Sequence, residues 1–271
     1  MITLPDCNIS DGSRFYDLFF IEKYDRMEQT TKGKREMQNM QQNPRCGAIL
    51  CAAEEELAPF LPHLAEEQRL SRAMLTLHIG RIGGLRMVLA ATGMCKVNAA
   101  LAVQTVLDTV SPDFVLNAGT AGGMSPALGL FETAVTTECA YHDVAEAILT
   151  ESHPHLPSVW FASDPDLLAA CRRAAERAPG RVHFGRTVTG EAFITDEGRA
   201  EINARFAPLT VDMETAAMAH VCYVNRVPFA AIRSVTDTAD HSGIGTFEEN
   251  CARASAVSAM LVLDVLRELT H

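Results

Sequence analysis

From Cys46 onward, short apolar runs alternate regularly with segments of helical periodicity. Strand-like runs that alternate with helical patterns are typical of α/β proteins. The run Phe114–Ala118 is almost entirely apolar, as expected for a strand covered on both faces. The predicted strands are 46–52, 74–79, 86–91, 114–118, 133–140, 181–189, 209–212 and 229–235, and the predicted helices are 55–63, 97–110, 164–177, 197–205, 213–225 and 247–269.

The first 45 residues have a different composition. Residues 22–45 mix both charges with Gln, Asn, Thr and Met and lack a sustained apolar period. Such a segment buries too little apolar surface to offset the entropy of ordering. We therefore expect residues 1–45 to be a flexible extension and residues 46–271 to be one folded domain.

Charge and cysteine usage exclude several classes of protein. The net charge of −11 disfavours a nucleic-acid partner, because phosphate neutralisation needs clustered Lys and Arg. Uninterrupted apolar stretches are too short to span a membrane. Eight cysteines are scattered without a CxxC pair, which indicates buried free thiols rather than metal ligands or disulfides. These features predict a soluble protein of the reducing cytoplasm.

Carboxylates and a glycine-rich turn follow the predicted strands. The first strand is followed by Glu54-Glu55-Glu56, another by Gly119-Thr-Ala-Gly-Gly123, and two more end in Asp212-Met-Glu214 and Ser234-Val-Thr-Asp237. Ligands of open α/β sheets bind outside the carboxyl ends of the strands. The sequence therefore predicts a small-molecule site built from these segments.

Six motifs in a fixed order give this prediction a specific form. Together they resemble the methylthioadenosine/S-adenosylhomocysteine nucleosidases, and the resemblance extends from Cys46 to the C-terminus. It implies a three-layer nucleoside phosphorylase-like fold with a central mixed, twisted and partly barrel-like sheet flanked by helices. It also implies a homodimer that binds an adenine nucleoside. The motifs are Ala52-Ala-Glu-Glu-Glu56, Asn117-Ala-Gly-Thr-Ala-Gly-Gly123, Tyr141-His-Asp143, Gly190-Glu-Ala-Phe-Ile194, Val211-Asp-Met-Glu-Thr-Ala-Ala217 and Arg233-Ser-Val-Thr-Asp-Thr-Ala-Asp240.

Two carboxyl groups receive catalytic roles from this resemblance. Glu56 matches the general base that takes a proton from the attacking water, which is otherwise a poor nucleophile. Asp237 matches the residue that protonates N7 of adenine as the C1′–N9 bond breaks, and this requires a pKa raised by burial. Taken alone, Glu54–Glu56 would be read as acids at a helix start and Asp237 as a helix N-cap.

The remaining site residues surround the nucleoside in the resembling family. Glu214 corresponds to the acceptor of the ribose hydroxyls, with Met213 beneath the sugar and Phe247 as an apolar wall. Phe193 would stack on the base, and the backbone of Ile194 would read its edge. The other assignments are Thr120, Ala121, Gly122 and Arg233 around the water, Thr236 beside Asp237, and Met94 and Pro157 at the 5′ substituent. No metal or organic cofactor is expected, because acid–base chemistry suffices.

Three alternatives remain open at this stage. A purine nucleoside phosphorylase shares the fold, although three carboxylates after the first strand would repel phosphate. A non-catalytic nucleoside-binding protein would be expected to lack Glu56 or Asp237. The 5′ group is uncertain because Cys95 stands where the family often has glycine and Leu149 where an aromatic is expected. 5′-Deoxyadenosine or 6-amino-6-deoxyfutalosine is therefore a further candidate substrate.

Overall fold

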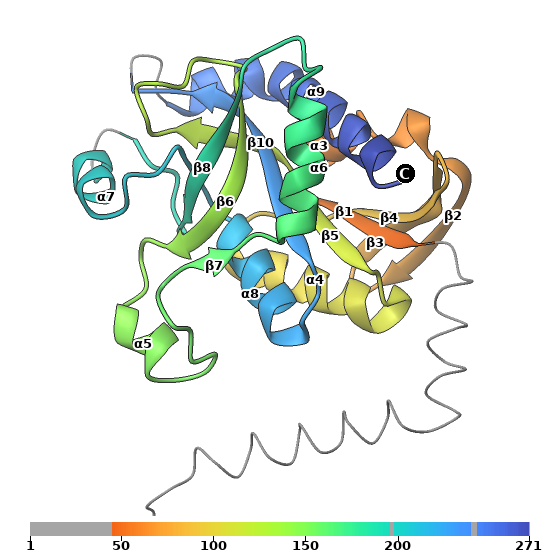
Figure 1. Ribbon diagram of the computed structural model, residues 1–271, viewed down its shortest axis with the longest axis horizontal. Coiled ribbons are helices and arrows are strands. Elements are labelled where there is room, and N and C mark those ends of the chain that lie inside the picture. Colours follow the sequence, from red (N-terminus) through yellow and green to blue (C-terminus); the bar gives the residue numbers. More distant parts are fainter. Residues whose placement is uncertain (1–44, 196–197, 240–242, 271) are drawn as a thin grey trace, which may run out of the picture. The chain divides into compact units, whose positions relative to one another are not determined.

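The computed structural model describes residues 45–195, 198–239 and 243–270 (Figure 1). The predicted extension, residues 1–45, lies outside the described residues except for Arg45. The strands are β1 (Cys46–Cys51), β2 (Ala65–Arg72), β3 (Leu75–Ile82), β4 (Leu85–Ala91), β5 (Phe114–Gly123), β6 (Thr133–Tyr141), β7 (Phe161–Ala162), β8 (Val182–Thr189), β9 (Thr210–Asp212) and β10 (Phe229–Asp237). The helices are α3 (Glu54–Leu57), the 3₁₀ turn η1 (Leu61–His63), α4 (Lys96–Val110), α5 (Glu146–Thr150), α6 (Pro165–Ala175), α7 (Arg199–Phe206), α8 (Thr215–Asn225) and α9 (Ile244–Glu268).

All ten of these strands belong to one mixed sheet. Its order is β10-β6-β8-β9-β5-β1-β4-β3-β2, with β7 paired to β6. Strand β10 also pairs with β5, so β5, β10, β6, β8 and β9 close on themselves while β1 to β4 extend outward as an open sheet. The expected partly barrel-like α/β sheet is thus confirmed.

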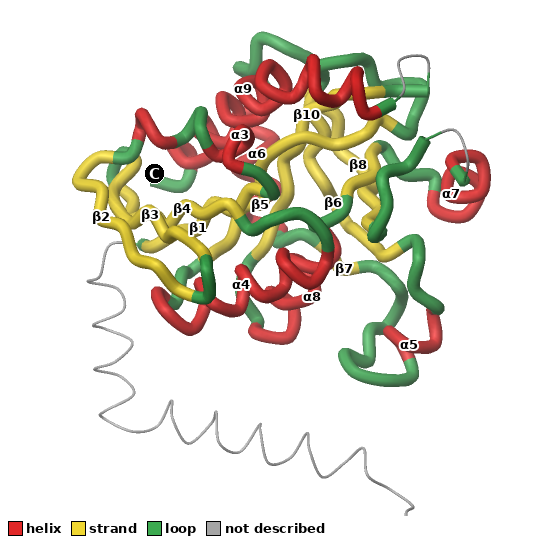
Figure 2. Tube along the Cα trace, turned by 180° about the vertical axis from the view of Figure 1, so that it is seen from behind, coloured by secondary structure: helices red, strands yellow, loops and turns green. Residues whose placement is uncertain are grey.

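Helices cover the sheet on two sides. Figures 1 and 2 show α3, α6 and α9 on one side and α4 and α8 on the other. The first side is filled by a cluster that includes Phe60, Phe114 and Val262, and the second by one that includes Val103 and Met218. Helix α4 buries Ala99, Ala102, Val103, Val106 and Leu107, which is the spacing of a single helical face. No helix within the described ranges is long and apolar enough to cross a membrane.

The predicted helix 55–63 is wrong as a single element. The structure has the four-residue helix α3 and the separate turn η1. Pro59 and Pro62 cause the break, because each lacks a backbone N–H and its ring crowds the preceding turn. Helix α3 therefore spans little more than the Glu54-Glu55-Glu56 run.

Strand β2 and the short strand β7 and helix α5 were not predicted. Every residue of β2 is exposed, and its charged sequence fits an edge strand that resists pairing with other chains. The turn from β2 to β3 places Ala73 and Met74 at positive φ, 49° and 64°. Hairpin turns of this kind usually contain Asn or Gly, so Ala-Met gives no recognisable turn signal.

Candidate active site

The carboxyl ends of β1, β5 and β10 lie side by side. In the parallel register Leu50 of β1 pairs with Asn117 of β5, and Ser234 of β10 pairs with Thr120. The chain therefore brings the segments after β1 and β10 to the same edge as the glycine-rich end of β5. The antiparallel strand β9 adds Asp212 and Glu214, because Val211 pairs with Gly122.

The carboxylate of Glu56 is buried against the end of β5. One oxygen accepts hydrogen bonds from the backbone N–H of Thr120 at 2.7 Å and from its hydroxyl at 2.8 Å. The other accepts from the N–H of Ala52 at 2.8 Å and from that of Ala53 at 3.4 Å. Every donor belongs to the β1 end or to β5, so the strand ends themselves orient this carboxylate.

Gly119 leaves the space that Glu56 occupies. Its φ is +147°, and an added Cβ would lie 2.5 Å from the Glu56 carboxyl carbon. Such a contact is far shorter than van der Waals distance, and a side chain at this φ would be strained. A glycine is therefore needed here for Glu56 to reach the turn.

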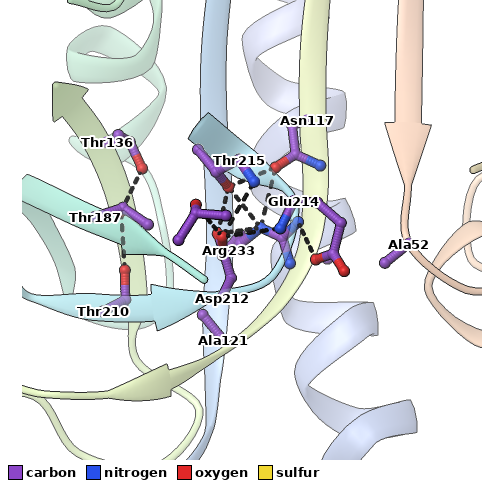
Figure 3. A network of polar contacts seen from close by, with 12 residues as sticks. Ala52, Asn117, Ala121, Thr136, Thr187, Thr210, Asp212, Glu214, Thr215 and Arg233 are labelled. Atoms are coloured by element: carbon purple, nitrogen blue, oxygen red, sulfur yellow. Dashed lines mark hydrogen bonds and ion pairs between the residues drawn. The ribbon is translucent and has the colours of Figure 1, made fainter. Parts of the chain in front are cut away.

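Arg233 connects the carboxylates through a buried network (Figure 3). Its Nε lies 3.1 Å from Asp212 Oδ2 and donates to Asn117 Oδ1 at 3.0 Å. Nη1 donates to the carbonyl of Thr120 at 2.6 Å, and Nη2 to Glu214 Oε2 at 3.3 Å. The guanidinium thus ties β5, β9 and β10 together, and its N–H groups are directed at acceptors of this chain.

Asp212 fixes the turn that presents Glu214. Its Oδ1 accepts from the hydroxyl of Thr189 at 2.6 Å and from the backbone N–H of Thr215 at 3.0 Å. Its Oδ2 accepts from the Thr215 hydroxyl, whose oxygen also lies 2.8 Å from Asn117 Oδ1. A carboxylate with this many donors is held rigidly, which makes Asp212 a support for its neighbour rather than a free group.

Glu214 is buried next to two other acids. The backbone N–H of Cys95 donates to its Oε1 at 2.9 Å. Burial, opposed by the charge of Arg233, raises the pKa of Glu214 to about 7. Near neutral pH this side chain therefore exchanges between the carboxyl and carboxylate forms.

Asp237 is buried at the end of β10. The hydroxyl of Thr236 donates to its Oδ1 at 2.9 Å, and Asn250 of α9 holds the carbonyl of Thr236 at 2.8 Å. A Cβ added to Gly122 would lie 3.3 Å from Asp237 Oδ2, so β5 approaches this carboxyl closely as well. Burial raises the pKa of Asp237 despite the opposing hydrogen bond from Thr236. A raised pKa is what a proton donor requires.

A model of the phosphorylase superfamily matches residues 48–267. A 5′-methylthioadenosine/S-adenosylhomocysteine nucleosidase of Geobacillus thermodenitrificans is 34% identical over 224 residues, which cover 81% of this chain and 95% of that relative. The chain belongs to this nucleosidase family, within the phosphorylase superfamily.

Solved structures of the nucleosidase family have the same fold. The enzyme of Neisseria meningitidis, in complex with methylthio-immucillin-A, matches with a TM-score of 0.77 and 33% identity, covering 82% of this chain and 99% of that one. The enzyme of Colwellia psychrerythraea, in complex with adenine, matches with a TM-score of 0.76 and 31% identity, covering 84% and 96%. The family is one of N-glycosyl hydrolases, and its fold is the one expected from the sequence.

Two aromatic side chains assigned to the nucleosidase site meet in the structure. The rings of Phe193 and Phe247 lie edge to face, with centroids 6.2 Å apart. They come from the segment after β8 and from the first turn of α9, respectively. Ile194 packs beside a small core cluster, and Met213 is half-buried between Asp212 and Glu214.

Met94 adjoins the site, whereas Pro157 lies outside it. Met94 is 60% exposed and precedes Cys95 at the rim next to Glu214. Pro157 lines a hollow of about 520 Å³ together with Pro228 and Phe229, at the beginning of β10 rather than at its carboxyl end. Within a single chain Pro157 therefore does not join Glu56 and Asp237.

Sequence reasoning missed several members of the network. Asp212, Thr215 and Asn117 lie within the quoted motifs, yet none of them was assigned a role. Their signal was available, since polar residues in apolar strand ends are rarely without partners. Cys95 was noted only as a departure from the family, and its contribution is a backbone N–H that no side-chain pattern reveals.

Proposed function

We propose that the protein hydrolyses the N-glycosidic bond of adenine nucleosides such as 5′-methylthioadenosine and S-adenosylhomocysteine. The observation that carries this proposal is the placement of Glu56 and Asp237 at the two ends of one stretch of β5. Gly119 lies against the first carboxyl and Gly122 against the second. Three residues of strand span roughly 10 Å. This separation suits a ribose–adenine bond held between a general base and a general acid.

The proposed reaction transfers two protons. Glu56 removes a proton from water while the water oxygen bonds to C1′ of the ribose. The electron pair of the C1′–N9 bond passes to adenine, and Asp237 gives its proton to N7. The products are adenine and a 5-substituted ribose, and exchange with solvent returns both carboxyl groups to their starting states. Positioned acids and bases typically contribute about 10²–10⁴-fold each.

Glu214 and Arg233 have supporting roles in this proposal. The Glu214 carboxylate would accept the ribose 2′- and 3′-hydroxyls and stabilise positive charge developing on the sugar. Arg233 holds Glu214 directly and reaches Glu56 through the carbonyl of Thr120. Phe193 and Phe247 provide the apolar faces for the base and the ribose.

The same contacts favour water over phosphate as the nucleophile. A phosphate dianion needs backbone N–H groups or cationic side chains. The N–H groups of Ala52 and Thr120 already donate to Glu56, and Arg233 is directed at Asp212 and Glu214. A phosphate at this position would meet the Glu56 carboxylate instead of a free donor.

Adenine release from a panel of 5′-substituted adenosines tests the activity and the preferred 5′ group together. The panel includes 5′-methylthioadenosine, S-adenosylhomocysteine, 5′-deoxyadenosine and 6-amino-6-deoxyfutalosine, each with and without phosphate. We expect adenine release without phosphate. Strict dependence on phosphate would make the protein a phosphorylase, and tight binding without release would make it a binding protein.

Three variants test the two catalytic assignments. E56Q and D237N should each lower kcat by a factor of about 10² or more in protein that still folds, which thermal unfolding checks. Glu55 precedes Glu56 in the same short helix and is exposed, so E55Q is the matched control and should retain full activity. Turnover close to that of the unaltered protein in E56Q or D237N would remove that residue from the mechanism.

We also propose that the protein forms a homodimer. Val97 and Leu101 lie one turn apart on α4 and are 76% and 51% exposed, and Met94 adjoins them. Exposed apolar side chains grouped in this way are typical of an interface. A second copy would also bring its own Pro157 segment to this chain's site, as the family resemblance implies. Light scattering after size exclusion should give twice the chain mass, and V97E/L101E should give the monomer mass.

A further inference from the structure

Arg199 is a buried cation with unused donors close to the Asp237 end of the site. It is the first residue of α7 and is only 7% exposed. Its Nη1 donates to the carbonyl of Gly123 at 2.6 Å and lies 3.4 Å from the sulfur of Met124. Its Nε and Nη2 are buried and have no hydrogen-bond partner among the described residues. Buried guanidinium groups normally satisfy their N–H groups, because leaving them unpaired is costly.

The anchoring point of Arg199 adjoins the proposed acid. Gly123 follows Gly122, which is the register partner of Asp237 and lies against its carboxyl. Burial raises the pKa of Asp237, whereas the hydrogen bond from Thr236 and the charge of Arg199 lower it. Arg199 and Asp237 thus approach the same pair of glycines at the end of β5, Arg199 from α7 and Asp237 from β10.

The other elements around Asp237 supply no comparable charge in the described part of the chain. Strand β5 presents Gly122 and Gly123 to it, and α9 contributes the neutral amide of Asn250. Arg233 lies on the same strand as Asp237 but pairs with Asp212 and Glu214. Glu248 and Glu249, at the start of α9, are exposed. Among the described residues, Arg199 is the charged side chain whose field lowers the pKa of Asp237.

We propose that Arg199 is a positioning residue for proton transfer: its fixed charge makes Asp237 a stronger acid and stabilises the carboxylate that remains after N7 takes the proton. This inference rests on the proposed function. In the step concerned, the proton moves from Asp237 to N7 of adenine as the C1′–N9 electron pair passes to the base. The negative charge left on Asp237 is then opposed by the Arg199 guanidinium in a region of low dielectric, where such an interaction is strong.

A purely structural role fits the contacts less well. An arginine that only bridged α7 to β5 would be expected to use its remaining donors on protein acceptors. A buried cation left with unpaired donors is instead a cost to stability. A purely structural role predicts that removing the charge leaves the pH profile of activity in place. The positioning role predicts that the profile moves.

The test is the pH profile of kcat for adenine release from 5′-methylthioadenosine. Activity requires protonated Asp237, so it falls as the pH rises through the pKa of that group. R199M removes the charge and should move this alkaline limb upward by about one pH unit. It should also lower kcat on the order of threefold, because Asp237 becomes a weaker acid. R199K keeps the charge, so the alkaline limb of its pH profile should coincide with that of the unaltered protein.

R205M is the matched control, because Arg205 belongs to the same helix but is exposed and lies over Phe206. The alkaline limb of the pH profile of R205M should not move. Thermal unfolding is measured for every variant, and R199Q replaces R199M as the neutral variant if R199M does not fold. An unmoved limb in the neutral variant, or a displaced limb in R199K, overturns the inference. Because the unaltered protein is assayed in parallel, absent adenine release there would instead overturn the proposed function.

Discussion

The backbone N–H of Cys95 donates a 2.9 Å hydrogen bond to the carboxylate of Glu214, 119 positions further along the chain. The bond exists because Cys95 adopts φ 76° and ψ 164°, a conformation found almost only in glycine. It turns the chain from β4 into the first turn of α4. The residue that orients the proposed ribose carboxylate is therefore held in a strained backbone conformation.

Replacing Cys95 by glycine should stabilise the protein. C95G removes the side chain that makes this conformation unfavourable, and the gain should be about 1 kcal/mol or more. C95A is the matched control, because alanine keeps the strain but loses the thiol. Urea unfolding should show a higher midpoint for C95G alone. Equal stabilisation in C95A would show that the thiol, and not the backbone, carries the cost.

The edge of the sheet that holds the site could be predicted because its signals are local. Apolar strands followed directly by carboxylates placed Glu56, Glu214 and Asp237 at strand ends, where the structure has them. The same reasoning failed where local signals were weak. Strand β2 is charged and exposed throughout, and its turn contains Ala73 and Met74 in place of typical turn residues.

The residues that hold the site's side chains in place could be predicted only in part, because many of them act through contacts between distant segments. Cys95 acts through its backbone, and Arg199 acts from a helix that carries no quoted motif. Nothing in the local pattern distinguishes Arg199 from Arg205, which lies on the same helix and is exposed. Burial and distance separate the two, and both require the folded chain.

Gly119→Ala should abolish most of the activity. The added Cβ would lie 2.5 Å from the Glu56 carboxyl carbon, and alanine is strained at φ +147°. Either Glu56 or β5 must then move, so kcat should fall by about 10² or more and stability by about 2 kcal/mol. Adenine release and urea unfolding measure the two effects. Among the described residues, a Cβ added at Gly84 would meet only Thr270, at 3.7 Å, so G84A is the control and should change neither.

The activity should depend on the ionisation of Glu214. Its pKa is raised to about 7, and the proposed role requires the carboxylate form. The value of kcat/KM should therefore rise with pH through about 7. E214Q should lower kcat/KM and remove this acidic limb. If the limb persisted unchanged in E214Q, it would belong to another group.

The same group should make stability depend on pH. A carboxyl group whose pKa is higher in the folded state than in the unfolded state stabilises the folded protein at low pH. For Glu214 that contribution is complete below about 4.5 and is lost as the pH rises through about 7. E214Q cannot ionise, so its stability relative to the unaltered protein should increase across this window and then level off. Unfolding free energies between pH 4.5 and 8 test this, and a constant difference would contradict it.

Removing Arg233 should destabilise the protein strongly and in a pH-dependent way. R233M leaves the buried carboxylates of Asp212 and Glu214 without their cation, which typically costs about 3–5 kcal/mol. The loss should be smaller at pH 5, where protonation of Glu214 removes one of the charges. R205M serves as the exposed control and should cost little.

The double variant R233M/D212N separates the charge effect from simple packing. If the cost of R233M comes from unpaired negative charge, replacing Asp212 by its neutral analogue should restore part of the stability at pH 8. Asn can still accept from Thr189 and Thr215, so the turn that presents Glu214 should be largely retained. Additive losses in the double variant would show that Arg233 stabilises β5, β9 and β10 through its hydrogen bonds to Asn117 and Thr120 rather than through its charge.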